Sequence, residues 1–466
     1  MTDQPSARLA AIVKAYDVRG LVPDELDQDV ARSVGAAFVE VMDVLADTGT
    51  VVIGYDMRPS SPSLAAAFAE GVNSTGADVV DIGLASTDEL YFASGRLALP
   101  GAMFTASHNP ARYNGIKLCR AEAAPVGADS GLRDIQVLAG RILDGEGGHT
   151  VPVGGSVTHK DMLPAYADHL QDLVNLTAIR PLKVVVDAGN GMAGHTVPAV
   201  FKGLPVDLVP QYFELDGNFP NHEANPLDPK NLIDLQQAVR AHGADLGLAF
   251  DGDADRCFVV DEKGDPVSPS AVTALVAVRE LAKAPGSMVI HNLITSKVVP
   301  EVVLAHGGKP VRTRVGHSYI KEKMAETDAV FGGEHSAHYY FRDFWRADTG
   351  MLAALHVLAA LGGQDKPASE LFAAYSKYPA SGEINSRVED AAATIAAIEQ
   401  TYAGREGITV DRLDGLTVDA RVWWFNVRPS NTEPLLRLNV EAEDEATMES
   451  VRDQVLGLIT GSQAHS

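Results

Sequence analysis

Three carboxylates in one short stretch carry the clearest chemical signal in the sequence. Asp251, Asp253 and Asp255 alternate with two small residues directly after the apolar run 246–250. Carboxylate oxygens are the ligands that Mg²⁺ prefers, and three such charges repel one another unless a cation lies between them. The stretch therefore predicts a loop that binds Mg²⁺. A solvated acidic turn is the alternative, and the apolar strand that leads straight into it disfavours that interpretation.

Two other acidic motifs resemble this stretch, and its neighbours disfavour both. Glu262 is twelfth from Asp251, as in an EF-hand calcium loop, but Arg256 stands where that loop needs glycine. The following residues, 257–260, form a β-type run rather than a helix. A phosphatase of the haloacid dehalogenase type needs threonine where Asp255 or Arg256 stands here. We therefore expect neither a calcium loop nor an aspartate nucleophile.

A serine and a histidine follow a second apolar run. Ser107 and His108 open the stretch S-H-N-P directly after the run 102–106. A serine exposed at the end of a strand can act as a nucleophile and carry a covalent phosphate. A turn or helix-cap serine fits the spacing equally well. His108 also has two interpretations, a general base or a histidine that orients its neighbours.

The stretch 332–338, G-G-E-H-S-A-H, follows a third apolar run, 329–331. Glu334 and Ser336 can hydrogen-bond to vicinal sugar hydroxyls, and His338 can move a proton near neutral pH. An ordinary surface loop is the alternative for this stretch.

The stretch 428–434, R-P-S-N-T-E-P, combines one charged donor with three neutral ones. Arg428 can hold a phosphate with two parallel hydrogen bonds. Ser430, Asn431 and Thr432 can complete a nest for an anion. The alternative is a proline-bounded turn that binds no ligand.

Short apolar runs of the β type alternate with helical patterns through most of the chain. This alternation predicts α/β domains with parallel or mixed sheets. Ligands bind beyond the carboxyl ends of strands in such sheets, so the three polar stretches that follow apolar runs should meet in one cleft. The other predicted strands are 51–54, 184–186 and 288–291, and the predicted helices are 27–45, 64–72, 232–241 and 268–282.

A chain of 466 residues is long enough for about three or four domains. Boundaries are expected near 145–158, 263–268 and 378–382. The last segment differs from the rest, because helix 392–402, strands 416–426 and 434–441 and helix 445–459 predict a small α+β domain. The predicted domains are 1–155 with the serine loop, 156–264 with the acidic loop, 265–379 with the sugar-binding loop and 380–466 with the phosphate-binding stretch.

The composition limits the classes of partner. The formal net charge is −24, which disfavours nucleic-acid binding because that needs a basic face, and a phosphate ligand would need a local cluster of Arg and Lys. The chain lacks a signal-peptide profile and an apolar run of about 18 residues, so we expect a cytoplasmic protein without a membrane partner. Cys119 and Cys257 lie in apolar stretches and are expected to be buried free thiols. No pattern indicates an oligomeric state.

Seven motifs, taken in order, resemble those of the α-D-phosphohexomutase superfamily and within it the phosphomannomutase/phosphoglucomutase group. They are Y-D-V-R-G at 16–20, T-A-S-H-N-P at 105–110, G-I-K at 115–117, D-G-D-A-D-R at 251–256, V-G-H at 315–317, G-E-H-S-A-H at 333–338 and R-P-S-N-T-E-P at 428–434. The resemblance spans nearly the whole chain. It implies three similar α/β domains and a small C-terminal α+β domain around a central cleft.

The resemblance also implies a role for each matching residue. Ser107 would be the phosphoserine and would hold one Mg²⁺ together with Asp251, Asp253 and Asp255. Lys117 and Arg19 would assist proton transfer and stabilise charge, and Arg256 would support the metal loop beside the substrate. Glu334 and Ser336 would bind the 3- and 4-hydroxyls of the sugar, and Tyr16 would contact the sugar. His338 and His317 would line the cleft, with His338 also in catalysis. The second phosphate would be gripped by Arg428, Ser430, Asn431 and Thr432.

The implied reaction interconverts mannose 6-phosphate and mannose 1-phosphate through phosphoserine 107 and a bound hexose 1,6-bisphosphate, and extends to glucose phosphates. A phosphoglucosamine mutase is the nearest alternative, but that group usually has Gln where His335 stands. A phosphosugar phosphatase on the same framework and an inactive phosphosugar-binding regulator are the others. Relatives often carry Lys in a D-V-K-x-T strand end where this chain has Ile294. Either Lys297 replaces that lysine or this strand end contributes none.

Overall fold

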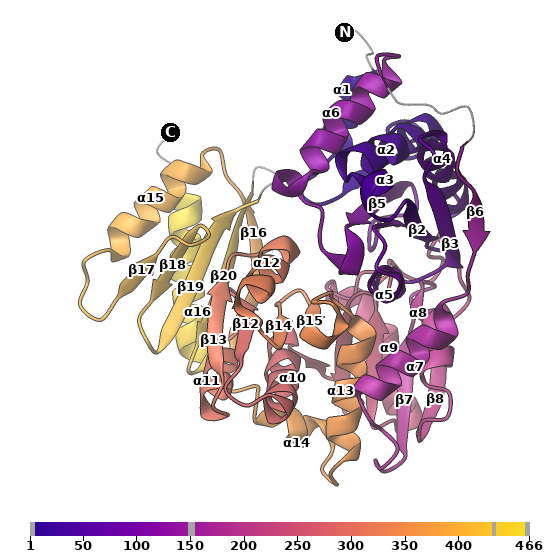
Figure 1. The fold of residues 1–466 in the computed structure, drawn as a ribbon. Coiled ribbons are helices and arrows are strands. Elements are labelled where there is room, and N and C mark those ends of the chain that lie inside the picture. Colours follow the sequence, from indigo (N-terminus) through magenta and orange to yellow (C-terminus); the bar gives the residue numbers. More distant parts are fainter. Residues whose placement is uncertain (1–4, 148–153, 431–434, 462–466) are drawn as a thin grey trace.

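The computed structural model describes residues 5–147, 154–430 and 435–461, and Figure 1 shows them as four domains along the chain. Domains I, II and III are α/β units, drawn from indigo through magenta to orange, and domain IV is the yellow unit that contains the C-terminus. Among the helices of the described residues, none combines the length and the apolar character needed to cross a membrane.

Domain I is built on a six-stranded sheet. Its strands are β1 (Val18–Leu21), β2 (Thr50–Tyr55), β3 (Asp78–Leu84), β4 (Gly101–Phe104), β5 (Tyr113–Cys119) and β6 (Val157–His159), paired in the order β1-β5-β4-β2-β3-β6. Its helices are α1 (Pro5–Ile12), α2 (Gln28–Val41), α3 (Val44–Asp47), α4 (Ser61–Ser74), α5 (Thr87–Leu97) and α6 (Leu132–Leu143). The helix α2 begins where the Asp27 carboxylate accepts a hydrogen bond from Val30 N at 2.9 Å, a typical N-cap.

Domains II and III repeat the same plan with fewer strands. Domain II contains β7 (Leu182–Asp187), β8 (Val206–Gln211), β9 (Leu246–Phe250), β10 (Cys257–Asp261) and β11 (Pro266–Val267) in the order β11-β10-β9-β7-β8, with α7 (Leu163–Leu173), α8 (Ala193–Val200) and α9 (Ile233–His242). Domain III contains β12 (Met288–Asn292), β13 (Lys309–Thr313), β14 (Phe331–Gly333) and β15 (Tyr339–Phe341) in the order β13-β12-β14-β15, with α10 (Pro269–Lys283), α11 (Val298–Ala305), α12 (His317–Thr327), α13 (Gly350–Gly362) and α14 (Ala368–Ala373).

One hairpin recurs in all three sheets and holds the candidate residues. A strand that lies parallel to its neighbour ends in a loop, and the chain returns antiparallel beside it, as β4–β5, β9–β10 and β14–β15. The loops enclosed are 105–112, 251–256 and 334–338. The polar stretches that the sequence singles out are therefore equivalent loops of three similar domains.

Domain IV is an antiparallel sheet with two helices. Its strands are β16 (Ala380–Arg387), β17 (Thr409–Asp411), β18 (Leu416–Asp419), β19 (Trp423–Pro429) and β20 (Leu435–Ala442), in the order β16-β20-β19-β18-β17, and its helices are α15 (Ala391–Tyr402) and α16 (Glu445–Gly461). Phe425 and Ile459 belong to a core formed by residues of this domain, whereas one continuous core runs through domains I, II and III. The predicted fold class, three α/β domains and one α+β domain, is confirmed.

Two predicted elements were wrong in detail. The helix expected over 27–45 breaks after α2 because Asp43 adopts a left-handed conformation with φ of 55°. The strand expected over 416–426 is a hairpin, in which Arg421 has φ of 70° and donates its N–H to the Asp419 carboxylate at 2.7 Å. The predicted buried free thiols, Cys119 and Cys257, are confirmed.

Candidate active site

A cavity of about 440 Å³ opens where the three hairpin loops approach one another. Domain I contributes most of its wall, domain II contributes the acidic loop, and domain III contributes α12, the 334–338 loop and Asp348. Its lining consists of Lys14, Tyr16, Asp17, Arg19, Tyr91, Ser107, His108, Asn109, Lys117, Leu118, Pro125, Val126, Asp255, Arg256, Lys321, His338 and Asp348. Loops that lie more than 140 residues apart along the chain therefore border one site.

Ser107 connects the first two loops directly. Its hydroxyl donates a hydrogen bond to Asp251 Oδ2 at 2.7 Å and accepts one from Arg256 Nη2 at 3.2 Å. His108 Nδ1 lies 2.5 Å from the same guanidinium nitrogen. Burial and the charge of Arg256 hold the pKa of His108 well below its usual range. His108 is therefore neutral and accepts from Arg256, which fits a histidine that orients its neighbours better than a general base.

The acidic loop has the donor set that a divalent cation needs. Asp251, Asp253 and Asp255 are buried, and one oxygen of each lies within 4.8 Å of the others. Asp253 Oδ1 and Asp255 Oδ1 are buried and accept no hydrogen bond from the described part of the chain. Buried carboxylate oxygens without a donor are costly, and a bound Mg²⁺ would satisfy them. The residues present therefore fit a Mg²⁺ ion.

The calcium-loop alternative does not fit the structure. The chain enters β10 at Cys257 directly after the loop, where an EF-hand would continue toward a helix. Glu262 binds instead to Ser369 of domain III, accepting from its backbone N–H at 2.8 Å and its hydroxyl at 2.6 Å.

Basic side chains offset the negative charge of the loop. Lys117 Nζ lies 2.7 Å from Asp253 Oδ2 and 2.6 Å from Asp255 Oδ2. Burial lowers the pKa of Lys117, but the two carboxylates outweigh burial and raise it well above its usual value. Burial raises the pKa of Asp251 to about 7, although Arg256 opposes that shift. Lys117 and Arg256 supply the local positive charge that an acidic protein needs to bind a phosphate.

Arg19 on β1 and Tyr16, in the segment before β1, also border the cavity. Arg19 donates from Nη1 to Asn109 Oδ1 at 2.6 Å and forms an ion pair with Asp17. Burial, followed by the charges of Tyr319 and Glu334, raises the pKa of Tyr16. Tyr16 therefore keeps its proton and can donate a hydrogen bond into the cavity.

The third loop reaches the acidic loop through a histidine. Glu334 is buried and accepts a hydrogen bond from the Tyr340 hydroxyl at 2.7 Å. The Ser336 hydroxyl lies 2.9 Å from His338 Nδ1, and His338 Nε2 lies 3.8 Å from Asp255 Oδ1. The structure thus brings the candidate sugar-binding residues next to the candidate metal ligands.

The candidate phosphate-binding residue Arg428 lies outside this cavity. Within the described residues, the cavity lining contains none from domain IV. Arg428 is buried and donates to Asn439 Oδ1 at 3.0 Å and to Glu383 Oε2 at 2.5 Å. Burial, followed by the charge of Arg428, lowers the pKa of His335 in domain III to about 3. Asn431, Thr432 and the side chain of His317 lie outside the described residues.

Sequence reasoning missed three residues around the site. Arg58 lies beneath the Ser107 loop, and Thr87 donates from Oγ1 to Asp253 Oδ2 at 2.5 Å. Lys321, on α12, is buried beside Asp348 at 2.7 Å, with its ammonium 4.2 Å from the ring of Tyr91. Arg58 had a usable signal, because it also follows the end of an apolar strand. Lys321 had none, since its exposed or buried position depends on how α12 packs.

Asp88, at the start of α5, lies where domains I, II and III meet. Its carboxylate accepts hydrogen bonds from Ser86 Oγ at 2.5 Å, Tyr166 OH at 2.7 Å and Thr349 Oγ1 at 2.7 Å. Burial raises the pKa of Asp88 to about 6, although these three donors oppose the shift. The preceding residue, Thr87, binds the acidic loop. This joint therefore fixes the position of the candidate metal site relative to all three domains.

Replacing Asp88 by asparagine should change the pH dependence of stability. The pKa of Asp88 is raised from 3.8 to about 6 on folding, so the native state holds this proton more tightly than the unfolded chain. The stabilisation is complete below about pH 4 and is lost as the pH rises through 6. Asparagine has no such loss. The free energy of unfolding of Asp88→Asn minus that of wild type should therefore increase between pH 5 and pH 8, by on the order of 1–3 kcal/mol.

Calorimetric melting of both proteins between pH 5 and 8 measures this difference. Asp207→Asn, which removes an exposed carboxylate on β8, is the control and should show no such trend. A difference between Asp88→Asn and wild type that does not vary with pH would contradict the assignment.

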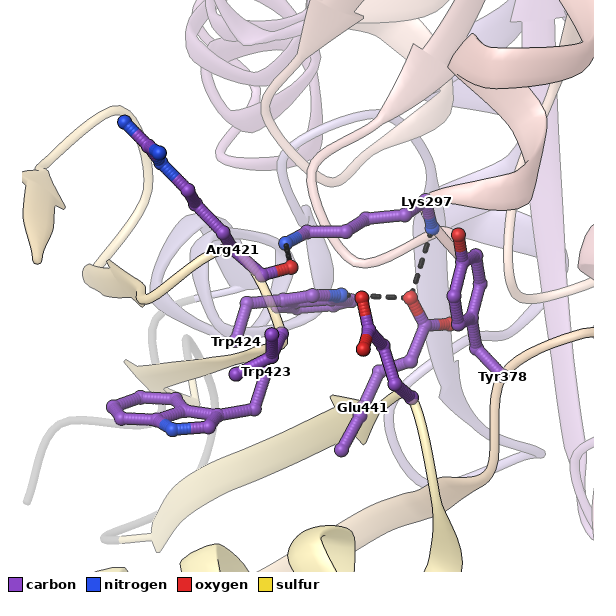
Figure 2. A pocket seen from close by; sticks show the side chains of 9 residues that line it. Lys297, Tyr378, Arg421, Trp423, Trp424 and Glu441 are labelled. Atoms are coloured by element: carbon purple, nitrogen blue, oxygen red, sulfur yellow. Dashed lines mark hydrogen bonds between the residues drawn. The ribbon is translucent and has the colours of Figure 1, made fainter. Parts of the chain in front are cut away.

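The strand end after β12 binds domain IV rather than the cavity. Figure 2 shows Lys297 at this junction, with its backbone N–H donating to Glu441 Oε1 at 2.9 Å. The Lys297 ammonium donates to Asp419 Oδ1 at 2.9 Å. Ile294 is buried against Trp424. Lys297 therefore does not replace a cleft lysine in this structure, and both residues attach domain III to domain IV.

Comparisons with known proteins agree with this arrangement. Four family models match in order: the phosphoglucomutase/phosphomannomutase alpha/beta/alpha domains I, II and III at residues 10–136, 164–264 and 268–378, and the C-terminal domain at residues 383–458. A phosphomannomutase of Escherichia coli strain K12 is 43% identical over 454 residues, which cover 95% of this chain and 97% of that protein. A protein of Xanthomonas campestris described as phosphohexose mutases is 43% identical, covering 96% and 99% of the two chains.

A solved structure gives the same result. The crystal structure of a phosphoglucomutase/phosphomannomutase family protein from Burkholderia thailandensis has a TM-score of 0.87 and 34% sequence identity, covering 100% of this chain and 99% of that one. Family models, relatives in sequence and a solved fold all extend over the four domains. The chain therefore belongs to the phosphoglucomutase/phosphomannomutase family and is an isomerase of the phosphohexomutase type.

Proposed function

We propose that this enzyme interconverts mannose 6-phosphate and mannose 1-phosphate and that it also acts on glucose phosphates. One observation carries the proposal: the Ser107 hydroxyl lies 2.7 Å from Asp251 and 3.2 Å from Arg256, in a cavity that the His338 loop also borders. A nucleophile, a set of metal ligands and a loop of sugar-binding side chains thus share one site. Relatives named phosphomannomutase, 43% identical, support the choice of sugar.

The proposed reaction passes through a phosphoserine. Phosphorylated Ser107 transfers its phosphoryl group to the 1-hydroxyl of mannose 6-phosphate, so the O–P bond to serine breaks as the new one forms. The product is a bound mannose 1,6-bisphosphate. The bound bisphosphate then reorients in the cleft so that its 6-phosphoryl group faces Ser107. This group moves to Ser107, and mannose 1-phosphate leaves. Hexose 1,6-bisphosphate also restores the phosphoserine after hydrolysis and so acts as the activator.

Positive charge around Ser107 lowers the barrier for this transfer. Mg²⁺ held by Asp251, Asp253, Asp255 and the phosphate on Ser107 would neutralise charge on the moving group. Lys117 and Arg19 border the cavity on the same side and supply further charge, and Lys117 holds a proton that it can give to the leaving oxygen. Arg256 holds the acidic loop and Ser107 in register.

The remaining residues bind the sugar and the phosphate that does not react. We assign Glu334 and Ser336 to bind the sugar hydroxyls. His338, next to Ser336, would transfer a proton to or from the bound sugar. Tyr16, which borders the cavity, is assigned to contact the sugar, and we propose that His317 lines the cleft. The other phosphate binds to Arg428, Ser430, Asn431 and Thr432. Arg428 and Ser430 belong to domain IV and do not line the cavity, so we propose that domain IV closes over bound substrate and excludes water.

The same proposal includes the domain limits and the location of the enzyme. The limits expected from the sequence, 1–155, 156–264, 265–379 and 380–466, leave each hairpin loop in one domain. The first two limits lie a few residues further along the chain, because β6 pairs with β3 of domain I and β11 pairs with β10 of domain II. A cytoplasmic location is consistent with the phosphosugar substrate and with the sequence, which has no signal-peptide profile and no long apolar run.

Substrate profiling tests the function. The enzyme would be activated with glucose 1,6-bisphosphate and assayed with mannose 1-phosphate, glucose 1-phosphate and glucosamine 1-phosphate, with the 6-phosphate product and inorganic phosphate measured together. We expect turnover of the first two sugars, slower turnover of the third and little inorganic phosphate. Faster turnover of glucosamine 1-phosphate would identify a phosphoglucosamine mutase. One phosphate released per sugar consumed would identify a phosphatase.

A further inference from the structure

Arg58 is buried directly beneath the loop that carries Ser107. Only 1% of its surface is exposed, and its guanidinium makes a hydrogen bond with each of its five N–H groups. One goes to Asp56 Oδ2 at 3.1 Å. Three go to backbone carbonyl oxygens of the loop, those of Ser107 at 2.8 Å, Asn109 at 2.7 Å and Pro110 at 3.0 Å, and one goes to that of Tyr113, the first residue of β5, at 2.9 Å. No N–H of the guanidinium remains for a ligand, so Arg58 acts through the loop.

The loop needs such support because of the conformation of Ser107. Its φ of 49° lies in the left-handed region, which is unfavourable for any residue except glycine and persists only where the surroundings impose it. The Ser107 carbonyl is held from two sides. Arg58 Nη2 donates to it, and the acidic loop packs so closely that a Cβ on Gly252 would lie 2.4 Å from the same oxygen. The position of this carbonyl therefore sets the distance between the serine and the metal ligands.

Arg58 is itself held in a fixed position. Asp56 accepts from the Ser61 hydroxyl at 2.6 Å and forms an ion pair with Arg58. From domain II, the ring of Phe219 lies 5.2 Å from the guanidinium carbon. Burial lowers the pKa of Arg58, and the charges of Asp56 and Asp253 oppose that shift. The guanidinium is therefore a charged and immobile template.

We propose that Arg58 is the positioning residue of the nucleophile: its guanidinium binds four carbonyls of the 105–113 segment and so holds Ser107 in the one conformation from which its hydroxyl reaches the metal loop. The inference rests on the proposed role of Ser107. Binding these carbonyls has a second effect, because oxygens turned toward Arg58 cannot face the anionic phosphoryl group. Lysine cannot replace this function, since an ammonium lacks the planar fork of donors.

The first test compares Arg58→Lys with wild type. The lysine keeps the charge but loses the fork, so the loop should shift while the substrate-binding residues stay in place. We expect kcat to fall on the order of 10²-fold, as for a misplaced catalytic group, with KM for mannose 1-phosphate changed less than about threefold. Single-turnover phosphorylation of Ser107 by glucose 1,6-bisphosphate should slow by the same factor as kcat. Arg180→Lys is the control, because Arg180 pairs with Asp245 away from the cavity, and its kinetics should not change.

The second test separates positioning from a general loss of structure. Arg58→Ala would be assayed with millimolar guanidinium, which can occupy the vacated site, and with equal sodium chloride. We expect guanidinium to restore kcat at least tenfold and to leave Arg180→Ala unaffected. If Arg58→Ala does not fold, Arg58→Lys alone decides. An unchanged kcat in Arg58→Lys, or a loss that lies in KM, would overturn the proposal, as would failed rescue of a folded Arg58→Ala. Absence of phosphate on Ser107 in the activated wild type would instead refute the proposed function.

Discussion

Alanine at position 107 should give a folded enzyme that binds hexose phosphate and does not turn it over. The substitution removes the hydroxyl that would carry the phosphoryl group, and no other hydroxyl lies at 2.7 Å from Asp251 among the described residues. Loss of a covalent nucleophile typically costs on the order of 10⁴–10⁶-fold in kcat. We expect a loss of this size. The cavity walls should not move, because the side chain of Ser107 is small and its loop is held through backbone carbonyls.

Three measurements on Ser107→Ala check this expectation. Turnover of mannose 1-phosphate should fall to background, intact mass should show no added phosphate after incubation with glucose 1,6-bisphosphate, and calorimetry should show a melting temperature close to that of wild type. Ser61→Ala would be an unsuitable control because it also disturbs Asp56, whereas Ser63, exposed on α4, can be replaced freely. An active Ser107→Ala enzyme would exclude the phosphoserine route altogether.

The substitution Asp253→Asn should weaken Mg²⁺ binding and lower the activity. The change keeps the shape of the side chain but lowers the charge of the acidic loop and removes a ligand. It also weakens the ion pair with Lys117 at 2.7 Å. Mutation of a residue that only supports a metal ligand typically lowers metal affinity 10–100-fold. Loss of a ligand itself should therefore weaken the apparent affinity for Mg²⁺ by more than about 100-fold. Activity at ordinary Mg²⁺ concentration should fall by a similar factor.

A Mg²⁺ titration of activity measures this effect, with isothermal calorimetry of Mg²⁺ binding as a readout independent of turnover. Wild type should lose activity in excess chelator and regain it when Mg²⁺ is returned, and Asp253→Asn should regain only part at high Mg²⁺. Asp245→Asn is the matched control, because it removes a carboxylate of domain II that pairs with Arg180 far from the loop. Full activity of wild type in excess chelator would disprove a metal requirement.

The architecture could be predicted from the sequence because the alternation of apolar runs with helical patterns agrees with the polar stretches that follow those runs and form the hairpin loops. The apolar run 246–250 followed by three carboxylates predicts both β9 and the acidic loop, because charged side chains rarely follow a fully buried strand without a partner. The break after α2 and the turn at Arg421 were missed for one common reason. Both use residues other than glycine in the left-handed conformation, and tertiary packing rather than residue type selects that conformation there.

The sequence predicted residues that line the cavity better than residues that position other side chains. Ser107, Asp255 and His338 line the cavity, and each comes from a motif recognisable in the sequence. Lys321 does not stand out, because its significance lies in partners brought by the fold. Arg58 follows a strand end, but its sequence position does not show that it acts through the Ser107 loop. Lys297 shows the opposite case. Its charge suggested a ligand, but the fold uses it to bind domain IV.

The joint at Asp88 has a consequence for how the protein is made. Thr349, one of its three donors, lies 261 residues further along the chain. At about 5–20 residues added per second, a ribosome needs on the order of 10–50 seconds to deliver it. During that interval the nascent N-terminal domain exposes a face that is later buried, with a charged carboxylate still hydrated by water. Chaperones that bind nascent chains should therefore engage this face of domain I until the third domain has left the ribosome.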